Sequence, residues 1–162
     1  MPENLCKCFQ MTSSKTYKLL KEARFRNHQP LEETITDLNI LFLKKYHRFG
    51  IYSKAFNKIE EGVNGADWEW WISNSSKSSW IGLRVQAKIL HLESNRFEHL
   101  HYKTKKTKTY QLTKLKNKCI DSKLIPLYCL YLHYPSRSLL HPLKCKSFTG
   151  NSSLYGCSIA SI

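Results

Sequence analysis

Two runs of alternating polar and apolar residues lie close together in the middle of the chain. The first covers residues 67–72, and in the second Arg84, Gln86 and Lys88 alternate with apolar residues. This period of two is typical of a half-buried strand. Residues 73–79, between the runs, are all Ser, Asn or Lys. We therefore predict an antiparallel hairpin with a polar turn.

The hairpin brings polar side chains of the two strands onto one face. With the turn centred in the middle of the polar segment, Asp67 lies opposite Gln86, and Glu69 lies opposite Arg84. Directly opposed residues of an antiparallel pair share a face, with their Cβ atoms about 5 Å apart. One face then carries these four residues and Lys88.

Four tryptophans belong to the same region. Trp68 and Trp70 alternate with the polar positions, so we expect them in the core beneath the first helix of the fold. Trp71 and Trp80 lie nearer the turn of the hairpin. They either pack on the hairpin or stack on an unpaired base.

The flanking segments predict an α/β fold. Apolar positions three and four residues apart indicate a helix over residues 31–50, with Glu32 and Glu33 at its start. Residues 51–56 suit a short strand. Residues 58–64 look like a polar turn. A helix from residue 111 and a strand buried on both faces at 126–134 follow the hairpin. The expected order is αβββαβ, a mixed sheet flanked by helices.

We expect one core domain with two less regular ends. Residues 1–30 are interpreted as a basic N-terminal extension that holds one short helix around 17–26. The core covers residues 31–134. Residues 135–162 are interpreted as an irregular C-terminal segment. We expect either that its end packs as a last strand or helical turn, or that the chain is a shortened version of a longer domain.

The net charge of the chain indicates which class of partner it binds. The chain has 26 Lys and Arg against 12 Asp and Glu, a formal net charge of +14. Such an excess favours polyanions, either nucleic acid or an acidic membrane, although many small basic proteins bind nothing specific. No apolar run approaches the roughly 20 residues that cross a bilayer, and no secretory signal is visible. We expect a cytoplasmic protein that binds nucleic acid and no membrane.

The six cysteines are expected to be free thiols in an intracellular protein. Their spacing contains no C-x2-C pair, which structural zinc sites usually have, so zinc is the weaker alternative.

The most basic stretch covers residues 102–118, with seven lysines and no acidic residue. Without acidic partners the lysines repel one another, which favours a phosphate-facing surface, although a solvated face is the ordinary alternative. The candidate contacts to nucleic acid are Lys103, Lys105, Lys106, Lys108, Lys114, Lys118 and Arg84.

The element order, with Gly65-Ala66-Asp67 and Gln86-Ala87-Lys88 on adjacent strands, resembles the restriction-endonuclease-like superfamily, whose signature is PD-(D/E)XK. The glutamine form resembles its Mrr-like branch. The longer string EEGVNGADWEWW…RVQAK, followed by PLYCLY and YGCSIAS, also resembles an uncharacterised bacterial domain family that we would place in this superfamily. The resemblance covers residues 31–134 and the C-terminal tail.

The resemblance implies a Mg²⁺-dependent or Mn²⁺-dependent nuclease that hydrolyses phosphodiester bonds of DNA, in defence, restriction or repair. By position, Asp67 is the principal metal ligand, Gln86 binds the metal or orients a water, and Lys88 holds the attacking water or stabilises charge on the phosphate. A helix glutamate completes such sites. Glu33 is our first choice, followed by Glu32, with Glu61 as a further candidate.

Two departures keep a second function open. Ala66 replaces the proline of the signature, and Gln86 removes one negative charge from the metal site. Glu69 could restore that charge, but an ion pair with Arg84 is its ordinary role. The alternative function is a non-catalytic nucleic-acid-binding or interaction module on the same fold. Cutting both strands of a duplex commonly needs a second subunit, so a homodimer is a further partner to test.

Overall fold

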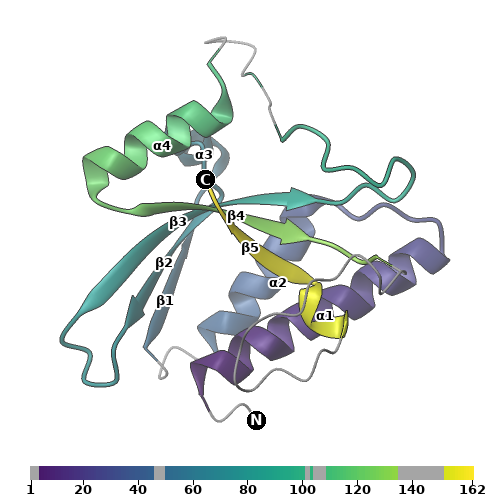
Figure 1. The fold of residues 1–162 in the computed structure, drawn as a ribbon, viewed down its shortest axis with the longest axis horizontal. Coiled ribbons are helices and arrows are strands. Elements are labelled where there is room, and N and C mark those ends of the chain that lie inside the picture. Colours follow the sequence, from purple (N-terminus) through teal and green to yellow (C-terminus); the bar gives the residue numbers. More distant parts are fainter. Residues whose placement is uncertain (1–3, 46–49, 101–102, 104–108, 135–151) are drawn as a thin grey trace.

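The computed structural model describes residues 4–45, 50–100, 103, 109–134 and 152–162, which form a layered α/β structure (Figure 1). The elements, in chain order, are α1 (Leu5–Phe25), α2 (Glu32–Lys44), β1 (Ile51–Ala55), α3 (Lys58–Asn64), β2 (Trp68–Ser73), β3 (Trp80–Ile89), α4 (Gln111–Ser122), β4 (Ile125–Tyr131), η3 (Ser152–Tyr155) and β5 (Cys157–Ser161). Helices α1 and α2 cover one face of the sheet, and α4 covers the other.

The described strands form one mixed sheet in the order β1-β2-β3-β4-β5. Neighbouring strands are antiparallel, except that β3 and β4 run parallel because α4 connects them. The predicted α/β class with a mixed sheet and flanking helices is therefore confirmed.

The hairpin forms in the predicted register. In the β2–β3 ladder, Glu69 pairs with Arg84 and Trp68 pairs with Val85. Asn74 stabilises the turn, since its side-chain oxygen accepts hydrogen bonds from two backbone N–H groups of the polar segment, at 3.0 and 3.3 Å. A polar turn and strict alternation were enough to specify the pairing.

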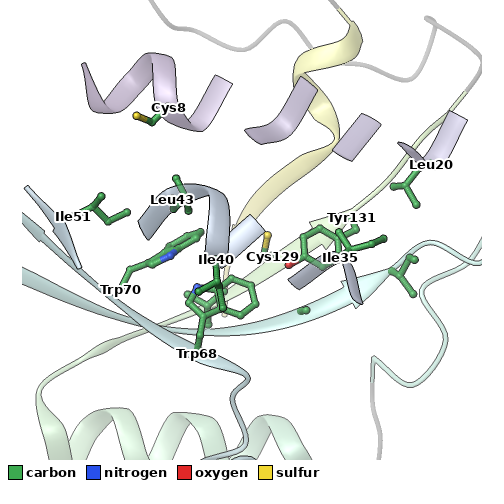
Figure 2. Packing of buried hydrophobic residues seen from close by; sticks show 13 residues of the cluster. Cys8, Leu20, Ile35, Ile40, Leu43, Ile51, Trp68, Trp70, Cys129 and Tyr131 are labelled. Atoms are coloured by element: carbon green, nitrogen blue, oxygen red, sulfur yellow. The ribbon is translucent and has the colours of Figure 1, made fainter. Parts of the chain in front are cut away.

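The main hydrophobic core lies between the sheet and the first two helices. Figure 2 shows Trp68 and Trp70 projecting from the sheet towards Ile40 and Leu43 of α2. The two tryptophans are 1% and 6% exposed, so their predicted place in the core is confirmed. A smaller cluster, around Leu115 on α4, covers the opposite face.

The structure differs from the expected domain organisation at the N-terminal end. Residues 5–25 form one long helix, and its Cys8 and Leu20 belong to the main core. The expected short helix at 17–26 is therefore corrected to a helix over Leu5–Phe25. No helix in the described ranges is both long enough and apolar enough to cross a bilayer.

Helix α3 was not expected, whereas a last strand at the C-terminal end was one of the expected alternatives. The stretch predicted as a polar turn, Lys58–Asn64, is helix α3, and Asn57 and Glu60 cap its start reciprocally. At the other end, the chain adds β5 to the edge of the sheet beside β4. Residues 135–151 of the expected irregular segment lie outside the described ranges.

Candidate functional site

Asp67 enters β2 directly after helix α3 and is fixed to the neighbouring strand. Its backbone N–H donates to the Val85 carbonyl at 2.9 Å, and its Oδ2 accepts from the Ala87 N–H at 2.5 Å. The carboxylate is therefore held against β3 at the level of Gln86.

Gly65 makes this entry to β2 possible. It ends α3 with a left-handed φ of +71°, and a Cβ there would lie 2.7 Å from the Gln111 carbonyl oxygen of α4. Only glycine combines that backbone conformation with so close an approach.

Lys88 and Glu32 meet at the far end of β3. The Lys88 Nζ lies 3.5 Å from Glu32 Oε1, and Glu32 Oε2 accepts from the Ile89 N–H at 2.9 Å. The lysine is only 6% exposed. A buried ammonium needs a carboxylate partner, and the first turn of α2 provides it.

A small cleft of about 50 Å³ opens beside Asp67, and carboxylates dominate its wall. The carboxylates come from α2, α3 and the start of β2; they are Glu32, Glu33, Asp37, Glu61 and Asp67. Two are bridged by one cation, since the Lys58 Nζ lies 2.5 Å from Glu33 and 2.9 Å from Glu61. Hydrogen bonding to Glu33 is the main cause that raises the pKa of Lys58.

The cleft favours a proton or a cation on Asp67. The pKa of this carboxyl is raised from 3.8 to about 7, mainly by burial and to a smaller extent by the charges of Glu32 and Glu61. The Ala87 N–H and the Lys88 charge act in the opposite direction. Burial likewise raises the pKa of Glu32. A positive ion at this position would relieve the desolvation of both carboxylates.

Gln86 is fully buried and has unused hydrogen-bonding capacity. It is 0% exposed, and neither its Oε1 nor its Nε2 has a partner within the described chain. It pairs with Tyr128 across the parallel β3–β4 ladder. Because an unpaired buried amide is costly, Gln86 is suited to bind a group that the protein itself does not supply.

The structure brings Asp67 and Lys88 to the same corner of the molecule, but the helix glutamate beside them is Glu32. Glu33, our first choice, turns to Lys58, and its side chain is 60% exposed. Both glutamates line the cleft, Glu32 is the one that pairs with Lys88, and which of them binds a metal stays a prediction. Gln86 lies on the neighbouring strand and does not line the cleft.

Arg84 is not available to nucleic acid. Its guanidinium is buried and forms an ion pair with Glu69, and it also donates to the Lys118 carbonyl at 3.3 Å. The Trp71 indole donates to the same carboxylate at 3.3 Å. The expected phosphate contact from Arg84 is therefore wrong, whereas the alternative ion pair with Glu69 is confirmed.

Three of the candidate lysines lie within the described chain. Lys114 donates to the Gly62 carbonyl at 2.8 Å, Lys118 lies 3.9 Å from Asp121, and Lys103 lies over the Tyr110 ring. All three are on or near α4, whose buried residues are Leu115 and Cys119. The remaining candidates Lys105, Lys106 and Lys108 lie outside the described residues. Contact with phosphate stays a prediction.

The oxygen donors at the cleft suit a hard divalent cation. Within the described ranges, no three His, Cys, Asp or Glu side chains are gathered as a ready metal site. Mg²⁺ needs less, because it keeps several waters and binds through one or two carboxylates. Asp67 and Glu32 are coupled electrostatically and fit that requirement in chemistry and charge.

The comparison with known families agrees with the resemblance to an uncharacterised family. A family model described as "Family of unknown function (DUF6615)" matches residues 5–162, and the chain belongs to this family. No curated protein matches the chain.

Proposed function

We propose that this member of the DUF6615 family is a divalent-metal-dependent nuclease that hydrolyses DNA phosphodiester bonds. One observation carries the proposal. The Asp67 carboxylate, with a pKa raised to about 7, is hydrogen-bonded to β3 close to the Glu32–Lys88 pair and lines an acidic cleft. Perturbed carboxylates beside a buried lysine are typical of catalytic sites.

The order of elements supports the proposal. Apart from the short helix α3 between β1 and β2, the elements from α2 to β4 follow the αβββαβ order of the restriction-endonuclease-like superfamily. Asp67 lies at the start of the second strand, and Gln86 and Lys88 lie on the third, as in that superfamily.

Asp67, Glu32, Lys88 and the lysines of α4 each have a defined task in this proposal. Asp67 and Glu32 supply carboxylate oxygens, and a Mg²⁺ ion bound to them would polarise the phosphate and acidify a water. Lys88 adds a positive charge that opposes the negative charge developing on the phosphate. No task is assigned to Gln86, whose buried amide is unpartnered within the described chain and does not line the cleft. The lysines of α4 attract the DNA backbone.

The proposal is tested by cleavage of supercoiled plasmid and of single-stranded DNA, with Mg²⁺ or Mn²⁺. We expect Asp67→Asn and Lys88→Met each to lower the rate by about 100-fold or more. Asp121→Asn, on α4, changes the charge equally outside the cleft and should leave the rate unchanged. Because Asp67 must lose its proton to bind a cation, wild-type activity should rise with pH through about 7.

Equal cleavage by all these proteins would show that the activity is a contaminant and would sink the proposed site. A second candidate function is DNA binding without cleavage. It is favoured by the neutral Gln86 and by Lys58, which already neutralises two of the cleft carboxylates. Salt-sensitive binding of DNA by a wild-type protein that cuts with neither metal would support this second function.

A further inference from the structure

Three aromatic side chains form a row across the hairpin end of the sheet, which we call the aromatic row. Tyr52 of β1 pairs with Trp71 of β2, and Trp71 pairs with Gly82 of β3. Trp80 lies two positions before Gly82 on the same strand and therefore projects from the same face. Diagonal neighbours such as Trp71 and Trp80 are about 7–8 Å apart, within reach of aromatic side chains. The row thus consists of Tyr52, Trp71 and Trp80.

Gly82 fixes the middle of the row. Two carbon atoms of the Trp71 six-membered ring lie 3.0 Å from the position that a Cβ on Gly82 would take, and the Leu124 side chain approaches the same position. A glycine inside a strand often marks such a close approach. The Trp71 indole therefore lies over the neighbouring strand, against the small cluster beneath α4.

The two outer members of the row are open to solvent. Tyr52 is 59% exposed and Trp80 is 46% exposed. Figure 1 shows that the turn end of β2 and β3 extends past helices α1 and α2. The exposed Ile81 belongs to the opposite face, because its strand partner is Ile72, which packs against the main core. The row therefore presents aromatic rings rather than aliphatic side chains.

The charges near the row favour an anionic partner. Lys77 lies in the turn between β2 and β3, Lys123 follows the end of α4, and both residues are exposed. Glu69, the carboxylate that accepts from the Trp71 indole, already forms an ion pair with Arg84. The chain as a whole carries a formal net charge of +14. A polyanion is therefore attracted to a surface that also offers aromatic rings.

We propose that the aromatic row binds single-stranded nucleic acid. Unpaired bases stack on Tyr52 and Trp80, and the phosphates lie near Lys77 and Lys123. A duplex does not fit this chemistry, because its bases are stacked on one another and their faces are covered. Trp71 lies four positions after Asp67, about 14 Å at the spacing of a strand. The binding needs no metal and no cleavage, so it is independent of the proposed nuclease activity.

Three fluorescein-labelled oligonucleotides separate stacking from charge. A thymidine dodecamer has bases and phosphates, a dodecamer of abasic sites has the phosphates alone, and a duplex dodecamer has paired bases. Binding to the whole chain is measured by fluorescence anisotropy in the presence of EDTA, which prevents metal-dependent cleavage. Trp80→Ala removes one exposed ring. Ile81→Ala is the matched control, since it removes an exposed side chain at the next position on the opposite face.

We expect the thymidine dodecamer to bind at least about 10-fold more tightly than the abasic dodecamer, because only the former can stack. Trp80→Ala should weaken binding of the thymidine dodecamer by about 5- to 100-fold and leave the other two oligonucleotides unaffected. Trp80→Phe should restore most of the affinity because it keeps a ring face. Ile81→Ala should bind as wild type does.

Other results overturn the proposal. Equal binding of the thymidine and abasic dodecamers by wild type would mean that charge alone is responsible. Equal losses from Trp80→Ala and Ile81→Ala, or an equal loss of duplex binding, would remove the stacking role of Trp80. If none of the oligonucleotides binds, the row serves another partner, such as a protein. The wild-type comparison of the two single-stranded dodecamers decides the matter even if a variant fails to fold.

Discussion

Asp67 is predicted to cost the metal-free protein stability at neutral and alkaline pH. Its pKa is 3.8 in an unfolded chain and about 7 in the fold, where it faces Glu32 of α2, Glu61 of α3 and Lys88 of β3. Between these pH values the folded protein keeps a proton that the unfolded chain has lost. The free energy of unfolding therefore falls as pH rises from about 4 to 7, and the loss is complete above 7.

Asp67→Asn removes this titration while keeping the shape of the side chain and an oxygen that can accept from Ala87. At about 1.4 kcal/mol per pKa unit, the pKa change is worth about 4 kcal/mol. Because the residue keeps some contact with solvent, we expect the variant to be about 2–4 kcal/mol more stable than wild type at pH 8. The difference should be near zero at pH 4.

The measurement is urea unfolding followed by tryptophan fluorescence at several pH values in the presence of EDTA. Asp121→Asn serves as a control and should show no pH-dependent gain. A gain for Asp67→Asn that stays constant from pH 4 to 8, or a wild type that is the more stable protein at pH 8, would refute the reasoning. Under the proposed function, added Mg²⁺ should stabilise wild type at pH 8 and leave Asp67→Asn unchanged.

Two further predictions concern the structural support of the site. Glu69→Leu should destabilise the fold by about 3–5 kcal/mol in urea unfolding, because it leaves the Arg84 guanidinium buried without a partner. The double variant Glu69→Leu with Arg84→Leu should recover part of this loss. Gly65→Ala should lower the free energy of unfolding by at least about 1–2 kcal/mol, because Gly65 has a left-handed backbone conformation. Gly62 is a helical position with open space around it, so Gly62→Ala should raise the free energy of unfolding by about 0.5–1 kcal/mol. Equal effects of the two alanine substitutions in thermal unfolding would contradict the role given to Gly65.

The hairpin was predictable because residues close together in the sequence determine it. Strict alternation and a wholly polar turn define both the faces and the register, which placed Glu69 opposite Arg84 and Trp68 in the core. The ion pair could be anticipated from that register. The choice between Glu32 and Glu33 could not, because adjacent helix residues point in different directions and only the docking of α2 on β3 decides which one meets Lys88.

Helix α1 was predicted only in its C-terminal part and helix α3 was missed, for different reasons. The buried positions of α1 include Thr12, Ser13 and Thr16, so its inner face is too polar for a search based on hydrophobic periodicity. Helix α3 has no buried residue at all. Its signal was the capping pair Asn57 and Glu60, three residues apart, which marks a helix start without any apolar pattern.

The closing contact between α1 and the C-terminal strand has a consequence for synthesis in the cell. Ser13 of α1 donates to the Leu154 carbonyl at 2.6 Å and accepts from the Cys157 N–H at 2.9 Å, and Ser13 and Leu154 are 141 positions apart in the sequence. Gly156 lies directly against the backbone of Tyr17. At about 5–20 residues per second, the ribosome releases the two partners on the order of ten seconds apart. During that interval the inner face of α1 lacks its final cover, which gives a chaperone time to bind the nascent chain.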